Sequence, residues 1–364
     1  MAPLPLALLS TIDPVLRDAV ALAATLEPGT VVLRYDLLDD AEDGRIRRLV
    51  TDLDGVVEDV VVPLDHACTS CAVREDAMPT LRRLAGERRW GQAVLALPVS
   101  AESLPIARTL APHATRGGAL SQYRLAAVIC AADLATFADD VLGDDLLAER
   151  DRALSADDRR SVGEALVGLV EHADVVVTDG DAGLLPAASE LLDHLRARDG
   201  ARVDGLHLVD GRRLFGTRHD PEVGELRTDL DRDPTVDGAG SHGVRTLRLR
   251  SDRPFHPDRL RDGVERLGSG PVRSRGVFWV PTRPDSVVGW EGSGGQLSVG
   301  TLGDWDEEEA RTDLTFTGLE GDLEHLPAAF AELLLSDDEI AQGLSPWLGR
   351  HDVLVDWLGE RSLG

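Results

Sequence analysis

The chain has 364 residues, which is more than a single domain usually contains, so we expect two domains. Hydrophobic residues make up 43% of the sequence and charged residues 28%, which is typical of a protein that buries a substantial core. The net charge of −27 argues against direct nucleic-acid binding, because it repels phosphate backbones. All 38 basic residues are arginine.

Two further classes of protein are disfavoured by the sequence. No apolar run approaches the ~20 residues that span a bilayer, and the apolar start lacks the basic region of a signal peptide. The three cysteines are too few for a disulfide scaffold, so we expect a cytoplasmic protein. Cys130 lies in the apolar run AAVICAAD and is expected to be a buried free thiol.

The first two thirds of the chain alternate apolar runs, which indicate strands, with amphipathic segments, which indicate helices. The expected strands are residues 4–9, 30–37, 56–64, 92–99, 124–132, 173–179 and 203–209. The expected helices are residues 13–26, 72–86, 102–113, 157–172 and 183–198. Continuous Val/Leu runs between helices predict an α/β fold with a doubly wound, mostly parallel sheet covered on both faces.

The composition changes after residue 215. Residues 216–243 are rich in Asp, Gly and Pro and lose periodicity, so we expect a linker or long loop between domains 1–215 and 244–364. The second part begins with an expected strand at 244–250, followed by a helix over Pro257–Leu267. Further short strands and the amphipathic segment 326–340 complete a small α+β domain.

The segment Cys68-Thr69-Ser70-Cys71 lies just before an expected helix and has three interpretations. Cys-x-x-Cys lets two thiolates bind one soft ion such as Zn²⁺, and His66 is a neighbouring donor. A structural zinc site wants four ligands, so such a site would be open and would suit transfer or sensing. The same pair at a helix N-terminus also fits a redox disulfide, or simply two packed side chains.

Three stretches resemble the CobW-like family of metal-linked GTPases (the CobW, HypB and UreG type) across most of the chain. They are HACTSCAVREDAMPTLRRLA, which is similar to the family's Gly-Cys-x-Cys-Cys segment, LPVSAESLPIARTL (97–110), and the pair RPFHPDRL and PVRSRGVFWVPTRPD (253–285). The last resembles the Arg-x-Lys-Gly-Phe-x-Trp signature of the family's C-terminal domain. The resemblance implies a P-loop-NTPase-like first domain and a CobW C-terminal-type second domain.

The nucleotide-binding motifs of this family are missing. A P-loop needs glycines and a Lys, whereas residues 10–20, STIDPVLRDAV, contain neither, and Asp13 brings a negative charge to the phosphate position. The family's guanine-reading Asn-Lys-x-Asp corresponds to Thr178-Asp179-Gly180-Asp181. We therefore expect a degenerate P-loop and no active GTPase, and we do not expect GTP as a cofactor, although the sequence leaves residual nucleotide binding open.

A subgroup in high-GC Gram-positive bacteria looks similar, including a Cys-x-Ser-Cys version of the cysteine segment, and it is associated with zinc limitation, zinc-independent ribosomal proteins and a ribosome hibernation factor. The resemblance implies a non-catalytic protein of zinc homeostasis with a metal site at His66, Cys68 and Cys71. It also implies a protein partner, either a ribosomal protein or a hibernation factor. The alternatives are a divergent GTP-dependent metallochaperone or nucleotide hydrolase, and a thiol oxidoreductase.

On the strand VRSRGVFWV, alternation places Arg273, Arg275 and Trp279 on one face. That face would be a docking surface if it were exposed. The competing interpretation is that Trp279 covers a helix and the arginines balance the excess of acids. His242 is a weak additional metal candidate.

Overall fold

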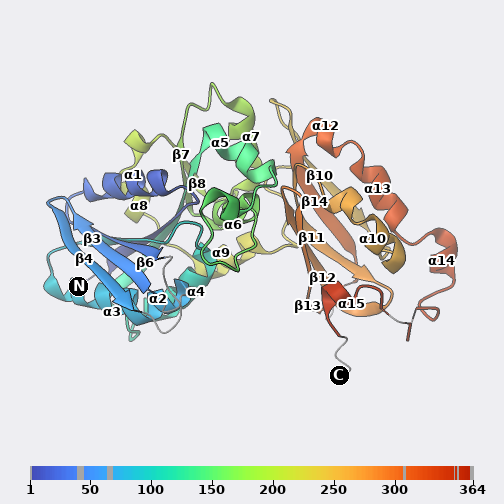
Figure 1. Ribbon diagram of the computed structural model, residues 1–364, viewed down its shortest axis with the longest axis horizontal. Coiled ribbons are helices and arrows are strands. Elements are labelled where there is room, and N and C mark those ends of the chain that lie inside the picture. The colour runs from blue at the N-terminus through green and yellow to red at the C-terminus, as the bar shows by residue number, and fades with distance from the viewer. Residues whose placement is uncertain are drawn as a thin grey trace.

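The computed structural model describes residues 2–38, 45–63, 69–305, 309–347, 349–350 and 352–360 (Figure 1). The strands of its first sheet are β1 (Leu4–Ser10), β2 (Thr30–Leu38), β3 (Arg45–Asp52), β4 (Gly55–Pro63), β5 (Gln92–Ala96), β6 (Tyr123–Asp133), β7 (Val175–Asp179) and β8 (Ala201–Asp204). Their order is β4-β3-β2-β5-β1-β6-β7-β8. The strands from β2 onward in this order are parallel, and β3 and β4 are antiparallel at the edge. The mostly parallel sheet that the sequence predicted is confirmed.

Helices cover both faces of this sheet, as the alternating pattern predicted. They are α1 (Pro14–Thr25), α2 (Thr69–Ala72), α3 (Met78–Glu87), α4 (Ser103–His113), α5 (Leu134–Leu142), α6 (Val162–His172), α7 (Pro186–Leu195), α8 (Gly211–Phe215) and α9 (Pro221–Thr228). Strand β1 shows why, because its side chains alternate between two apolar cores. Ala7 and Leu9 pack with α1 and α8, whereas Leu6 and Leu8 pack with α3 and α4.

The second sheet is antiparallel and forms the α+β domain that was expected. Its strands are β9 (Gly238–Ala239), β10 (Val244–Ser251), β11 (Val272–Val280), β12 (Arg283–Ser293), β13 (Gln296–Asp304) and β14 (Thr312–Leu319), in the order β13-β12-β11-β14-β10-β9. Its helices are α10 (Pro257–Gly263), α11 (Glu265–Gly268), α12 (Glu320–Leu323), α13 (Leu326–Leu333), α14 (Asp337–Ala341) and α15 (Val355–Leu358). Phe278 and Trp290 pack with Leu260 of α10 and Phe330 of α13 on one face. The other face is turned toward α5, α6 and α7 of the first domain (Figure 1).

Three sequence expectations are corrected. The stretch 216–243 is not a structureless loop, because it contains α9, which packs against α4 and α6. The apolar run 203–209 is mostly not a strand, since β8 ends at Asp204 and a 3₁₀ turn follows. The helix expected over Pro257–Leu267 is divided into α10 and α11. Among the described residues, no helix combines the length and apolarity that crossing a membrane requires.

Candidate functional site

The cysteine segment leads into a helical stretch whose middle part is a π-helix. Helix α2 carries Cys71, and a five-residue π-helix, Val73–Ala77, joins α2 to α3. π-Helical turns are rare and often occur at functional sites. Cys71 is 9% exposed, lies in α2 directly before the π-helix, and is disulfide-bonded in this structure, so it is a free metal ligand only after reduction.

Two of the three predicted metal ligands, His66 and Cys68, lie outside the described residues. The donor set of two thiols and an imidazole fits the ligand preference of zinc. Within the described ranges, no group of three or more His, Cys, Asp or Glu side chains could hold a metal ion. His242, the additional candidate, donates its backbone N–H to Glu190 Oε2 at 2.8 Å.

Asp76 fastens the π-helix to the sheet, a role that the sequence did not reveal. Its buried carboxylate pairs with Arg48 of β3 and accepts a hydrogen bond from the Tyr35 hydroxyl at 3.1 Å. Arg48 also donates to Thr80 of α3 at 3.0 Å and to Glu58 of β4 at 3.2 Å. Burial and the neighbouring Asp76 raise the pKa of Tyr35, so its phenol stays protonated as a donor. The helix behind Cys71 is therefore fixed to three strands.

The turn between β1 and α1 is where a P-loop would hold phosphates. Here the Asp13 carboxylate accepts the N–H groups of Val15 at 2.7 Å and Leu16 at 3.0 Å, and Pro14 is the first helical residue. Free N–H groups at a helix N-terminus are what bind anions. In this chain, the helix cap occupies two of them and adds a negative charge. The residues present do not fit a triphosphate.

The cation nearest this turn is also engaged. Arg17 of α1 is buried, and its Nη1 donates to the carbonyl oxygens of Tyr35 and Leu97, both at 3.3 Å. Its Nη2 lies 2.6 Å from the Asp36 carboxylate. Arg17 therefore links α1 to the ends of β2 and β5 and is committed to structural contacts.

In the stretch that corresponds to the guanine-reading motif, the polar side chains form hydrogen bonds with nearby parts of the same domain. Thr178 Oγ1 donates to the Asp204 carboxylate at 2.9 Å. Asp181 Oδ1 accepts the backbone N–H of Gly183 at 2.8 Å, which forms a local Asx turn. Gly180 has φ = 95°, a conformation that favours glycine. These side chains therefore stabilise the loop after β7.

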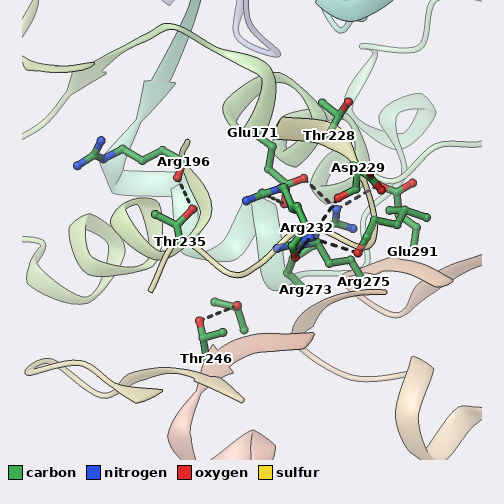
Figure 2. Close-up of polar contacts among 12 residues, drawn as sticks. Glu171, Arg196, Thr228, Asp229, Arg232, Thr235, Thr246, Arg273, Arg275 and Glu291 are labelled. Carbon is green, nitrogen blue, oxygen red and sulfur yellow. Dashed lines mark hydrogen bonds and ion pairs between the residues drawn. The ribbon is translucent and has the colours of Figure 1, made fainter. Parts of the chain in front are cut away.

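The face of β11 that carries Arg273 and Arg275, for which a docking surface was one of two interpretations, is not exposed. Arg273 and Arg275 are 3% and 4% exposed, and both extend toward the first domain and the loop that follows α9 (Figure 2). The idea of an exposed arginine surface is therefore wrong, because this face of the sheet is covered by the other domain.

Cys130 is fully buried, as expected, and burial raises the pKa of its thiol to about 12.

Comparison with known proteins gives matches over most of the chain. The model of the family described as cobalamin synthesis protein cobW C-terminal domain matches residues 244–334. A zinc chaperone of Mycobacterium tuberculosis strain H37Rv is 30% identical over 383 residues, which cover 93% of this chain and 90% of that protein. The zinc-regulated GTPase metalloprotein activator 1 of Dictyostelium discoideum is 23% identical over 261 residues, covering 68% and 55% of the two chains.

The fold comparison returns a distant solved structure. The crystal structure of the Zn(II)-bound YjiA GTPase from E. coli has 17% sequence identity and a TM-score of 0.34, covering 92% of this chain and 99% of that one.

Proposed function

Because this chain belongs to the CobW-like protein family, we propose that it is a non-catalytic member acting in zinc homeostasis. It binds zinc weakly through Cys68, Cys71 and His66, and it acts by docking on a protein partner associated with the ribosome under zinc limitation. The relative named zinc chaperone, which aligns over 93% of the chain, supports the choice of metal.

One observation carries the non-catalytic part of the proposal. The Asp13 carboxylate takes two N–H groups at the start of α1, at 2.7 and 3.0 Å, where a phosphate would need them free. A triphosphate would have to displace this cap and overcome the charge of Asp13, with no lysine in the chain to compensate. We therefore assign the function of the protein to metal binding by the thiols of Cys68 and Cys71.

The metal part is tested by titrating the reduced full-length chain with zinc against a chromophoric chelator. We expect the Cys68→Ser/Cys71→Ser double variant to lose most of the affinity, and His66→Ala to lose less, because thiolates are the stronger ligands. Cys130→Ala is the matched control and should bind like the wild type, since this thiol is buried away from the segment. Equal weak binding by the wild type and the double variant would refute the metal site.

The partner part is tested by capture from cells grown without zinc. The net charge of −27 suits a basic protein surface, which ribosomal proteins offer. We expect the wild-type bait to recover a ribosomal protein or hibernation factor and a charge-neutralised surface variant to recover less. Recovery of no ribosomal component by the wild type would count against the proposed ribosome-associated partner.

The second candidate is a GTP-dependent metallochaperone with a divergent nucleotide site. It is favoured by the name of the Dictyostelium relative, a zinc-regulated GTPase metalloprotein activator. It predicts that GTP stabilises the native chain, whereas the proposed function predicts no effect.

A further inference from the structure

A buried ion cluster joins the two domains at the end of α6. Arg273 of β11 reaches Glu171 of α6 with two contacts, Nε to Oε1 at 3.3 Å and Nη2 to Oε2 at 3.2 Å (Figure 2). Arg232, from the loop after α9, lies 3.5 Å from the same carboxylate. Arg273 also donates to the carbonyl oxygen of Gly292 at 3.3 Å and pairs with Glu291 at 3.1 Å. Both Arg273 and Glu171 are at most 4% exposed, so the pair is shielded from water.

Arg275 holds the loop that connects the domains. Its guanidinium donates to four carbonyl oxygens of this loop, those of Asp229 (3.2 Å), Leu230 (3.3 Å), Arg232 (3.0 Å) and Asp233 (3.3 Å). From the first domain, Arg198 donates to the carbonyl oxygens of Pro234 and Thr235, at 3.2 and 2.9 Å. Residues 229–235 are thus gripped from both sides, unlike a flexible linker.

The charges of this cluster are unequal. Two guanidinium groups, those of Arg232 and Arg273, pair with one buried carboxylate, Glu171, and Arg275 lines the same small cavity, with Glu291 at the half-exposed rim. Burial alone would raise the pKa of Glu171, but Arg273, Arg232 and Arg275 outweigh it and lower the pKa to about 2. Glu171 is therefore the shared counter-charge of arginines that come from the second domain and the loop.

Close contacts beside the cluster leave little room for the two domains to rotate relative to each other. Ser293, at the tip of the β12–β13 turn, donates to the carbonyl oxygen of Val141 at 2.8 Å. A Cβ atom at Gly294 would lie 1.7 Å from the Gly143 carbonyl oxygen, and one at Gly163 would lie 2.6 Å from Ser293 Oγ. Glycines on both sides allow the two domains to approach this closely.

We propose that Arg273, through its ion pair with Glu171, and Arg275, through its hydrogen bonds to the loop carbonyls, lock the two domains and the connecting loop into one orientation. The protein is then a rigid two-domain body, and ligand binding in the first domain is not transmitted as a rotation of the second. This inference stands whether or not the proposed zinc function holds. It assigns the arginines of the RSRGVFW segment to the domain interface.

Calorimetry and small-angle X-ray scattering of the full-length chain test the lock. In Glu171→Gln, Arg232 and Arg273 lose their counter-charge, so the single thermal transition of the wild type should separate into two and the radius of gyration should increase. The matched control is Glu332→Gln, which removes an exposed partner of Arg266 within the second domain. The control should keep one transition and the wild-type scattering curve.

A second variant keeps the proposal testable if Glu171→Gln does not fold. Arg275→Met removes the guanidinium from the loop carbonyls but leaves the Glu171–Arg273 pair in place. Trypsin should then cleave after Arg232 on the order of tenfold faster than in the wild type, because the loop opens locally. Wild-type scattering and a single transition in Glu171→Gln, or an unchanged cleavage rate in Arg275→Met, would overturn the lock.

Discussion

Two charged regions of this molecule, the β1–α1 turn and the domain interface, differ in what their side chains contact. At the β1–α1 turn, Asp13 caps α1 and Arg17 donates to the carbonyl oxygens of Tyr35 and Leu97, so both side chains make contacts within the first domain. At the domain interface, the Arg-Ser-Arg-Gly segment that resembles the family signature is present, buried and fully engaged. The charged groups at the turn therefore stabilise the first domain internally, whereas those at the interface hold the two domains together.

The largest expected effect lies at the interface. Glu171→Met should lower the free energy of unfolding by about 3–5 kcal/mol, because it leaves buried arginines without a counter-charge. Adding Arg273→Met should recover a large part of that loss, since the double variant replaces a buried ion pair by apolar contacts. Urea unfolding of the single and double variants measures this coupling. Additive losses would show that the two residues do not act as a pair.

The next effect is a pH dependence of stability that comes from His172. This residue follows Glu171 in the sequence, but its hydrogen-bond partner Ser103 lies in the first domain. Burial and the nearby His219 lower the pKa of His172 to about 3, and Asp174, Arg227 and Arg108 also face it. The unfolded chain, with a His pKa near 6.5, then binds the proton first as the pH falls. Stability from this group is complete above about pH 6.5 and is lost progressively toward pH 3.

Between pH 7.5 and pH 5, His172 should therefore contribute a loss of about 2 kcal/mol, at about 1.4 kcal/mol per pH unit below 6.5. Urea unfolding at the two pH values measures it. The control is His172→Asn, which keeps a polar partner for Ser103 but does not titrate. An equal pH dependence in both proteins would contradict the assignment.

A smaller effect is expected at the β1–α1 turn. Asp13→Ala should cost about 1 kcal/mol of stability by removing the helix cap, whereas Asp13→Ser should cost only a few tenths because serine also caps. Neither change should create GTP-dependent stabilisation, since the glycines and lysine of a P-loop remain absent. A GTP response in Asp13→Ala would show that this carboxylate alone had blocked the site.

The smallest effect concerns thiol reactivity. In the reduced native protein, iodoacetamide should leave Cys130 unmodified at pH 8, because the buried thiol has a pKa of about 12 and no access to solvent. Mass spectrometry after digestion measures the labelling. Rapid modification of Cys130 without denaturant would contradict its burial.

The sequence predicted most elements with a clear hydrophobic period, although the amphipathic helix α5 was not among them, and it missed elements built from charges. Strand β3, RIRRLVTD, was not predicted, because its arginines hide the period-two pattern, and the fold brings Asp59, Asp76 and Glu58 to pair with Arg47 and Arg48. Helix α9 was missed for the same reason: Arg227 binds Asp174 and Asp199 across the chain. Local composition cannot show such long-range pairing.

The interface was the part least accessible to sequence reasoning. Arg273 and Arg275 belong to the segment that resembles the family signature, but alternation alone cannot tell whether their face is exposed or covered. Glu171 carried one overlooked signal, since it is an acid among apolar residues near the end of VGEALVGLVEH. The family itself was identified from motifs and is confirmed by a relative 30% identical over 93% of the chain.

The most direct test of the account is the melting temperature of the full-length protein with millimolar GTP and Mg²⁺. A ligand present at 100 times its Kd would stabilise the native state by about 2.7 kcal/mol and shift the melting temperature by several degrees. The account predicts no shift, because the Asp13 cap and the missing lysine leave no group to hold the triphosphate. A reproducible rise with GTP, absent with GMP, would contradict it.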